Sequence, residues 1–290
     1  MDRSYGIAPP GFRLPDATHV GAVHLQVADL ERSIDYYAGV LGTRVLDRTA
    51  DAAALGAAGD ARVLIRLRQR AGARGARGEL GLYHFAILLP ERAALGRFAA
   101  HLHRHGARAG MSDHLVSEAV YLTDPDGLGI EVYADRPRDS WKHDGRELAM
   151  ATEPLDVRSV IAAGGGVEWN GMPEGTTMGH IHLHVANLPA AEAFYHAALG
   201  FDKMVWSYPG ALFLAAGGYH HHLGTNTWSR GPSAAPDQAR LLESELVVPD
   251  PGAAAAAARS LQAAGFDARD TGSGWIAADP WGTALRVVAA

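Results

Sequence analysis

The 290-residue sequence contains no cysteine. This absence excludes disulfide bonds, thiolate metal sites and a cysteine nucleophile. Fifteen histidines are present, so any bound metal ion has to be held by nitrogen and oxygen ligands. Composition therefore restricts the metal chemistry to imidazole and carboxylate groups.

Long hydrophobic runs and a strong charge excess are missing as well. No stretch approaches the roughly 20 apolar residues that span a bilayer, and the N-terminal sequence MDRSYGIAPPGFRLPD lacks the charged-then-apolar pattern of a signal peptide. The formal net charge of −6 offers no basic field for nucleic acid or anionic lipid. We therefore expect a cytoplasmic protein that binds a small molecule, and neither nucleic acid nor membrane. Whether it forms a homo-oligomer stays open.

What the sequence does contain is an internal repeat. Residues 23–42, VHLQVADLERSIDYYAGVLG, match residues 181–200, IHLHVANLPAAEAFYHAALG, position for position. In each copy an alternating apolar run predicts a strand, Asp29 or Asn187 predicts a helix N-cap, and the Leu-Gly pair predicts the helix end. The same unit therefore occurs twice.

Weaker copies follow each of these segments, at residues 83–106 and 243–266. Short apolar runs come after each helix, such as AVYLTDPDGLGIEVY at 119–133, where Asp-Pro-Asp-Gly predicts a tight turn between strands. The sequence thus predicts four modules, each with the order βαβββ.

A polar stretch with glycine and proline separates the second module from the third. Such a stretch is typical of a crossing between domains. We expect a first domain at 1–135 with modules one and two, a connector at 136–176, and a second domain at 177–290 with modules three and four.

Four βαβββ modules resemble the vicinal oxygen chelate superfamily, which contains glyoxalases, bleomycin-resistance proteins and extradiol dioxygenases. The resemblance covers nearly the whole chain. It implies an α+β fold in which the modules pair into two cupped mixed sheets. Because this superfamily includes lyases, isomerases, oxygenases and metal-free binding proteins, the fold alone does not decide the chemistry.

Candidate metal ligands lie in the two middle modules. In the superfamily that the chain resembles, ligands stand near the start of a module's first strand and on its last strand. The equivalent first-strand positions in modules one to four are Ala22, His84, His180 and Glu243, and the last strand of module two carries Glu131 in GIEVY. His84, His180 and Glu131 are therefore the expected ligands.

Two imidazoles and one carboxylate form the facial triad typical of non-haem Fe(II) oxygenases, which leaves positions open for substrate and O₂. We expect Fe(II), with Mn(II) as the second choice. A lone strand histidine is more often a hydrogen-bonded core residue, and we expect such roles for His182 and His184. A carboxylate between Ile130 and Val132 would be costly to bury without a partner.

The segment 113–133, DHLVSEAVYLTDPDGLGIEVY, carries the most specific resemblance. It is similar to the part of type I extradiol dioxygenases in which an Asp-His-x-Val-Ser run and a tyrosine precede the glutamate ligand. The matching residues are His114 and Tyr121. The resemblance implies that both hydrogen-bond the substrate hydroxyl and the developing intermediate.

The resemblance also implies a catalytic acid/base histidine on the last strand of the partner module. The expected strand is YHHHLG at 219–224, and alignment of the following residues favours His221. Because side chains alternate along a strand, His220 and His222 would face the other way, and a shift of one residue would exchange the assignment.

One feature departs from common extradiol dioxygenases, in which modules three and four carry the ligands. Here modules two and three carry them. We therefore expect these two modules to pair, so that His84, Glu131, His180 and His221 share one cup, while modules one and four form a metal-free half. If module one paired with two and three with four, the dioxygenase interpretation would fail.

The resemblance implies an extradiol dioxygenase that inserts O₂ into a catechol- or hydroquinone-type aromatic at Fe(II). One alternative is a glyoxalase-type isomerase or lyase, which would use His221 as a fourth ligand, and another is a metal-free small-molecule-binding protein. The exact ring and the position of cleavage stay open. Five aromatic residues could line a ring-binding pocket, although such residues more often belong to the core: Trp206, Tyr208, Phe213, Trp228 and Trp281.

Overall fold

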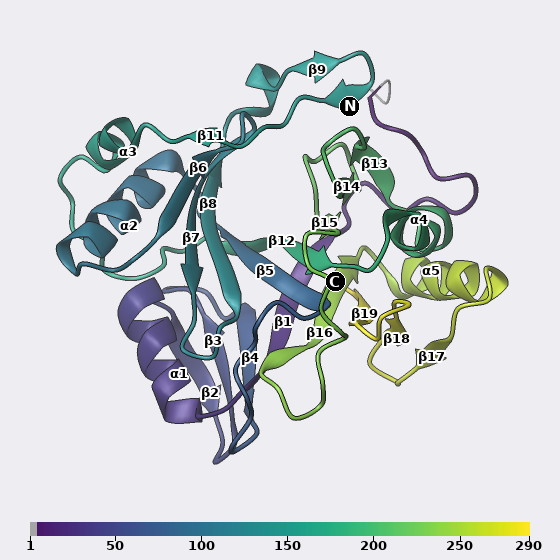
Figure 1. Cartoon of the computed structure of the whole chain (residues 1–290), viewed down its shortest axis with the longest axis horizontal. Helices are drawn as coiled ribbons and strands as arrows, with labels where there is room; N and C mark the ends of the chain where they lie inside the picture. The colour runs from purple at the N-terminus through teal and green to yellow at the C-terminus, as the bar shows by residue number, and fades with distance from the viewer. Residues whose placement is uncertain (1–4) are drawn as a thin grey trace.

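In the computed structural model, which describes residues 5–290, each sequence repeat folds into one βαβββ module (Figure 1). Module one consists of β1 (His19–Val27), α1 (Leu30–Tyr36) with a π-helical turn (Tyr37–Leu41), β2 (Arg44–Arg48), β3 (Ala52–Gly56) and β4 (Val63–Gln69). Module two consists of β5 (Gly81–Leu88), α2 (Arg92–Arg104), β6 (Gly110–Asp113), β7 (Ser117–Thr123) and β8 (Gly129–Asp135).

The second half of the chain repeats this order after a connector. The connector holds a short 3₁₀ helix (Arg138–Ser140), β9 (His143–Asp144), β10 (Glu147–Leu148), β11 (Glu153–Pro154) and α3 (Val157–Ala163). Module three consists of β12 (Thr177–His184), α4 (Leu188–Ala191) with a π-helical turn (Glu192–Ala198), β13 (Asp202–Val205), β14 (Ala211–Ala215) and β15 (Leu223–Asn226). Module four consists of β16 (Arg240–Val248), α5 (Pro251–Ala263), β17 (Ala268–Asp270), β18 (Trp275–Ala278) and β19 (Ala284–Ala289).

Helix starts and ends follow the local signals in the sequence. The side chains of Asp29 and Asn187 each accept a backbone N–H, at 3.1 and 2.9 Å, and so cap α1 and α4 as predicted. Each helix then ends at a glycine with positive φ, 80° at Gly42 and 102° at Gly200. Glycine adopts this conformation without the steric cost of a Cβ, which explains the Leu-Gly end of both repeats.

The modules pair into two mixed sheets in the way that the ligand pattern required. Sheet A joins modules two and three in the order β11-β6-β7-β8-β5-β12-β15-β14-β13, and sheet B joins modules one and four in the order β17-β18-β19-β16-β1-β4-β3-β2. The joints are antiparallel, β5 with β12 and β1 with β16. The expected pairing of module two with module three is thus confirmed. The division into domains at 1–135 and 177–290 remains a prediction.

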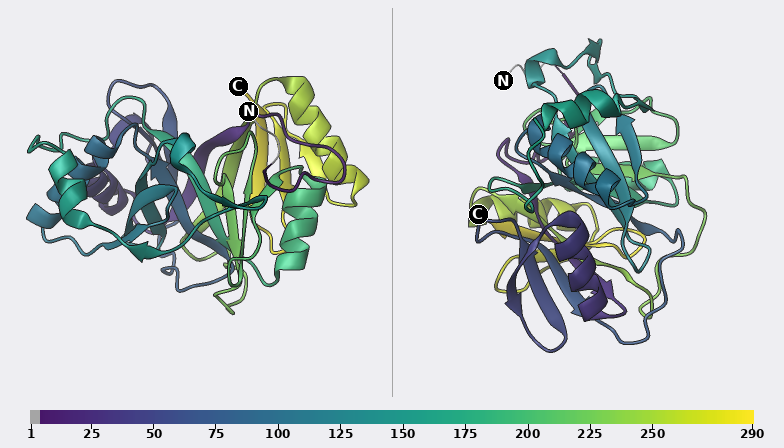
Figure 2. Two further views of the ribbon diagram at one scale, coloured as in Figure 1. Left: turned by 90° about the horizontal axis from the view of Figure 1, so that it is seen from above. Right: turned by 90° about the vertical axis from the view of Figure 1, so that its left-hand side faces the viewer.

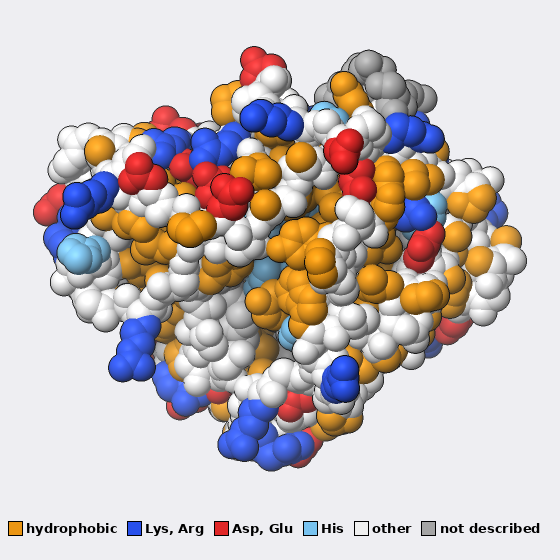
Figure 3. Space-filling view, turned by 45° about the horizontal axis from the view of Figure 1, so that its top comes forward, with side chains coloured by type: hydrophobic (Ala, Val, Ile, Leu, Met, Phe, Trp, Pro, Cys, Tyr) orange, Lys and Arg blue, Asp and Glu red, His pale blue; other side chains and the backbone are white. Residues whose placement is uncertain are grey.

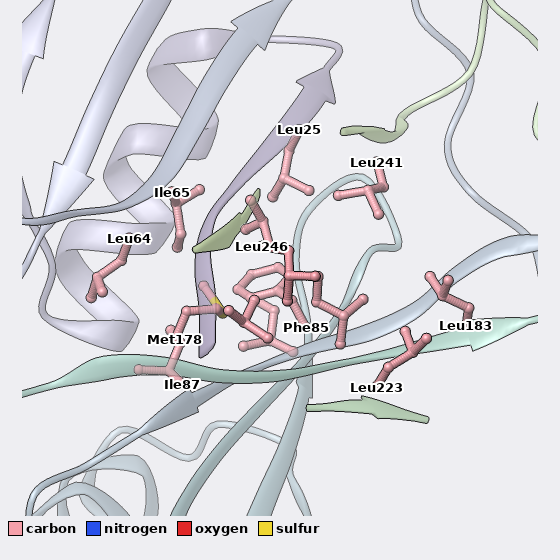
Figure 4. Packing of buried hydrophobic residues seen from close by; sticks show 14 of the residues in the cluster. Leu25, Leu64, Ile65, Phe85, Ile87, Met178, Leu183, Leu223, Leu241 and Leu246 are labelled. Atoms are coloured by element: carbon pink, nitrogen blue, oxygen red, sulfur yellow. The ribbon is translucent and has the colours of Figure 1, made fainter. Parts of the chain in front are cut away.

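The two sheets share one hydrophobic core. Figure 4 shows how Leu25 and Ile65 of sheet B face Phe85, Ile87 and other buried side chains of sheet A. The helices lie outside, with α1 and α2 at one end of the molecule and α4 and α5 at the other (Figure 2). Within residues 5–290 no helix is both long and apolar enough to cross a membrane. Sheet A packs Phe85, Ile130 and Ile181 into the shared core. Because side chains alternate along a strand, the neighbouring residues His84, Glu131 and His182 lie on its other face, where they line a cavity.

Candidate metal centre and cavity

His84, Glu131 and His180 meet on three adjacent strands of sheet A. His84 lies on β5, Glu131 on β8 and His180 on β12, and β5 is the strand between the other two. One ligand atom from each side chain lies within 4.8 Å of the others. The two histidine Nε2 atoms are 3.0 and 3.1 Å from Oε2 of Glu131. The strands thus bring together the three residues that the repeat singled out.

The donor atoms of this cluster fit a divalent cation. All three side chains are buried, and Nε2 of His84 has no hydrogen-bond partner although it lies beside the carboxylate. An unsatisfied buried nitrogen is costly in a protein interior, whereas a shared cation would satisfy both imidazoles and the carboxylate. Two nitrogens and one carboxylate oxygen are the donor set of facial-triad iron or manganese sites.

The electrostatics of the cluster favour the protonation states that bind a metal. Burial by itself would raise the pKa of Glu131, but the neighbouring His180 and His84 outweigh burial and hold this pKa well below its usual range. Burial also lowers the pKa of His180 to about 4, against the opposing effect of Glu131. An ionised carboxylate and a neutral imidazole are the forms that coordinate a cation.

A cavity of about 190 Å³ opens beside the three residues. In the space-filling view of Figure 3, histidine side chains appear at the bottom of a hollow bordered by hydrophobic side chains. The lining includes the three candidate ligands, His114, Tyr121, His182, His221, and the aromatic residues Tyr83, Tyr208, Phe213 and Trp228. Two other aromatic candidates, Trp206 and Trp281, pack against the core instead. The cavity therefore combines convergent polar groups with apolar walls, as small-molecule sites do.

His114 and Tyr121 lie together at one wall of this cavity. The backbone carbonyl of Ala151 accepts a hydrogen bond from His114 Nδ1 at 2.7 Å. In a neutral ring Nε2 is then the acceptor, and the Tyr121 hydroxyl donates to it at 2.6 Å. Burial and the charge of Glu131 raise the pKa of Tyr121 well above its usual value. Tyr121 therefore stays a neutral phenol beside the candidate ligands.

The three consecutive histidines do not lie on a strand, so this expectation was wrong. β14 ends at Ala215 and β15 begins at Leu223, and the histidines lie in the connection between them. Because strand alternation does not operate in such a connection, each ring takes its own direction. The ring centroid of His221 lies 4.0 Å from that of His180, and His221 lines the cavity whereas His220 and His222 do not.

His220 and His222 have other partners. Nδ1 of His222 accepts the backbone N–H of Ala216 at 3.2 Å, and His220 binds Asp135 and His221. Asp135 had no signal in the sequence analysis, because it lies 85 residues from His220 along the chain.

Two lining residues were undervalued or missed in the sequence. His182 stands opposite His84 across the β5–β12 joint, and its Nε2 is buried without a hydrogen-bond partner. Room for its ring comes from Gly224, where an added Cβ would lie 2.9 Å from the imidazole. Tyr83 precedes His84 and packs its ring against His84 and Trp228 at centroid distances of 4.8 and 5.7 Å. The signal in the sequence that could have identified Tyr83 as a lining residue was its position directly before His84 on the same strand.

Comparison with known proteins shows the family to which the chain is related. The family model of the Glyoxalase/Bleomycin resistance protein/Dioxygenase superfamily matches residues 18–132. Over 270 residues the chain is 43% identical to the catechol-2,3-dioxygenase of Bacillus subtilis strain 168, which covers 91% of this chain and 94% of that protein.

Solved structures show the same fold at low sequence identity. A putative dioxygenase from Bacillus subtilis subsp. subtilis strain 168 has a TM-score of 0.67 at 14% identity, covering 96% of this chain and 86% of that one. Glyoxalase I from Zea mays has a TM-score of 0.56 at 18% identity, covering 94% and 92%. Fold, family model and a relative of 43% identity agree, and the chain belongs to the glyoxalase/bleomycin resistance protein/dioxygenase superfamily.

Proposed function

We propose that this protein is an extradiol dioxygenase that uses O₂ to open a catechol-type ring beside its hydroxyl pair. The observation that carries the proposal is the meeting of His84, Glu131 and His180 at a cavity that His114, Tyr121 and His221 also line. The 43% identity to a catechol-2,3-dioxygenase over most of both chains supports it.

In this proposal His84, Glu131 and His180 hold Fe(II), with Mn(II) as the second choice. The bound ion would supply Lewis acidity and one-electron chemistry at positions left open by three protein ligands. Everything else in the cavity serves to bind the ring, orient it and handle protons.

Ring binding falls to the aromatic walls of the cavity. Phe213 and Tyr208 pack edge to face at 5.6 Å, and Trp228 lies 5.5 Å from the ring of His182. Flat apolar walls of this kind suit an aromatic substrate. No lysine or arginine is among the cavity-lining residues of the described chain, which favours an uncharged catechol over one that carries a carboxylate.

Proton transfer falls to His221, with His114 and Tyr121 as hydrogen-bonding groups. Burial lowers the pKa of His221 well below its usual value, so the ring rests neutral and can take a proton from a substrate hydroxyl. A positioned base of this kind typically contributes about 10²- to 10⁴-fold to the rate. Tyr121 and His114 would hold the second oxygen of the ring through the hydroxyl and imidazole that they already pair.

The test is anaerobic reconstitution with Fe(II), followed by metal analysis, O₂ uptake and the yellow absorbance of ring-fission products on a panel of catechols and hydroquinones. His84→Ala, Glu131→Ala and His180→Ala should each lose both metal and O₂ uptake. His24→Ala is the matched control, because His24 occupies the position of His182 in sheet B. Full uptake in any of the three variants would contradict the ligand assignment.

The glyoxalase-type alternative makes a different prediction for the same panel. It expects tight metal binding without O₂ uptake, and it calls for His221 as a fourth ligand. Among the described residues, the cluster within 4.8 Å contains only His84, Glu131 and His180, which favours the dioxygenase. A protein that binds no metal at all would instead be a small-molecule-binding protein.

A further inference from the structure

A chain of hydrogen bonds runs from the edge of sheet A to the cavity. Asp135 is the last residue of β8, the strand that also carries Glu131. Its Oδ1 lies 3.0 Å from Nε2 of His220, and Nδ1 of His220 lies 2.7 Å from Nδ1 of His221. The chain thus links a partly exposed carboxylate to a histidine of the cavity through a fully buried ring.

Asp135 is held as an acceptor from two sides. The Tyr219 hydroxyl donates to the same Oδ1 at 3.2 Å. The Tyr219 oxygen in turn lies 2.7 Å from the hydroxyl of Tyr133. An ionised carboxylate can only accept hydrogen bonds, so the nitrogen of His220 that faces it has to carry a proton.

The proton on Nε2 of His220 determines where the other protons of His220 and His221 lie. In a neutral imidazole one nitrogen donates and the other accepts, so a proton on Nε2 leaves Nδ1 of His220 bare. Only one proton fits between the two Nδ1 atoms at 2.7 Å, and it then belongs to His221. The other nitrogen of His221, Nε2, is left without a proton on the ring edge away from His220.

We propose that Asp135 and His220 are positioning residues that fix the tautomer of His221, so that its bare Nε2 serves the cavity as the proton acceptor. In the step concerned, the O–H bond of a substrate hydroxyl breaks, its electron pair stays on oxygen, and an Nε2–H bond forms on His221. The negative charge of Asp135 then faces a positive ring pair. The role of His221 Nε2 as proton acceptor from a substrate rests on the proposed function. The tautomer of His221 follows from the hydrogen bonds alone and does not depend on that function.

The decisive variant is Asp135→Asn. Because the Tyr219 hydroxyl and His220 Nε2 meet the same oxygen of Asp135, an amide that places its NH₂ group there donates to both, while the Tyr219 hydroxyl donates to Tyr133. This arrangement reverses the chain and places the proton of His221 on Nε2. The same replacement in a serine protease triad produces the wrong histidine tautomer and a loss of about 10⁴-fold in kcat. Asp139→Asn is the control, because Asp139 is exposed on the following turn and loses the same charge without touching His220.

The primary readout is the tautomer, measured by long-range ¹H–¹⁵N NMR of the full chain without metal and then loaded with diamagnetic Zn(II). We expect the Nδ1–H pattern for His221 in the wild type and in Asp139→Asn, and the Nε2–H pattern in Asp135→Asn. A wild-type His221 protonated at Nε2 would overturn the proposal, and this holds even if Asp135→Asn does not fold.

The second readout is kinetic, on Fe(II)-loaded protein with catechol and O₂. We expect kcat of Asp135→Asn to fall by about 10²- to 10⁴-fold while KM changes far less, since a positioned base acts on the chemical step. An equal loss in Asp139→Asn, or a rise in KM alone, would contradict a positioning role. If the wild type takes up no O₂, the proposed function fails, whereas the NMR result still decides the tautomer.

Discussion

Sheets A and B place side chains at equivalent positions and use them in opposite ways. In sheet A, His84 lies opposite Gly129 and Ala86 lies opposite Glu131 in the β5–β8 pair. In sheet B, Glu243 lies opposite Ala284 and Glu245 lies opposite Arg286 in the β16–β19 pair. The position of a candidate ligand, Glu131, is thus taken by an arginine in the second cup.

The second cup pairs its polar and charged side chains with one another. Arg286 donates two hydrogen bonds to Glu243 at 2.9 and 2.8 Å, and the two nitrogens of His24 face Glu243 and Glu245 at 3.3 and 3.0 Å. In sheet A no arginine or lysine within residues 5–290 forms an ion pair with Glu131, and its ion-pair partners are His84 and His180. The comparison indicates that the fold provides equivalent side-chain positions in both sheets. Whether a metal cation can bind there depends on whether an arginine already pairs with the carboxylates.

The largest effect, on metal binding, should come from removing the negative charge of Glu131, which has no arginine or lysine partner among the described residues of sheet A. Glu131→Gln keeps the shape of the side chain but should weaken metal binding by more than about 100-fold, since loss of an outer-shell partner alone costs about 10- to 100-fold. Metal content after dialysis and O₂ uptake measure this change. The matched change in sheet B, Arg286→Gln, should leave the metal content unaltered, and an equal loss in both variants would contradict the comparison.

Two glycines at equivalent places should respond differently to a methyl group. A Cβ at Gly179, next to His180, would overlap the hydroxyl of Tyr133, whereas at Gly21 it would meet the side chains of Glu245 and Val247 at 2.9 Å. We expect Gly179→Ala to lower the free energy of unfolding by about 3 kcal/mol and Gly21→Ala by about 1 kcal/mol. Denaturant unfolding compares them. Equal losses would show that sheet A is no more tightly packed around its site than sheet B.

The buried histidines of sheet A should make the metal-free protein sensitive to acid. Burial lowers the pKa of His222 to about 3, so between about pH 6.5 and 3 the unfolded chain binds a proton there that the folded chain does not. Stability therefore falls as the pH falls, from this group by about 2 kcal/mol at pH 5. Denaturant unfolding at pH 7 and pH 5 measures the loss.

The variant for this prediction is His222→Asn, which should lose less stability on acidification than the wild type. His103→Asn is the control, because His103 is exposed near the end of α2. A His222→Asn protein with unchanged acid sensitivity would show that burial of this ring is not the cause.

The smallest effect should come from removing Arg286, which pairs with Glu243 in sheet B. Arg286→Met frees Glu243 from its partly exposed partner, and we expect a loss of about 1 kcal/mol in the free energy of unfolding. Metal content should stay at the wild-type value, because His24 still engages both carboxylates. A second bound equivalent of metal would show that the arginine alone keeps a cation out of sheet B.

Local patterns account for the parts of the molecule that the sequence predicted well. The repeats, the caps at Asp29 and Asn187 and the glycine ends depend on neighbouring residues only. Positional equivalence between repeats singled out His84 and His180. The connection that carries His220, His221 and His222 was wrongly predicted as a strand. Gly217 and Gly218, with φ of 59° and 67°, turn the chain just before these histidines, so the alternation of side chains along a strand does not apply there.

By itself, the sequence determined the four modules, the absence of thiolate chemistry and the kinds of side chain available to a site. Only the tertiary structure decided which modules share a sheet, that His180 and Glu131 meet although 49 residues separate them, and that Asp135 reaches His220. The physical reason is that strand order and register set these distances to within an ångström. They arise from packing between segments far apart in the chain, about which local propensity carries no information.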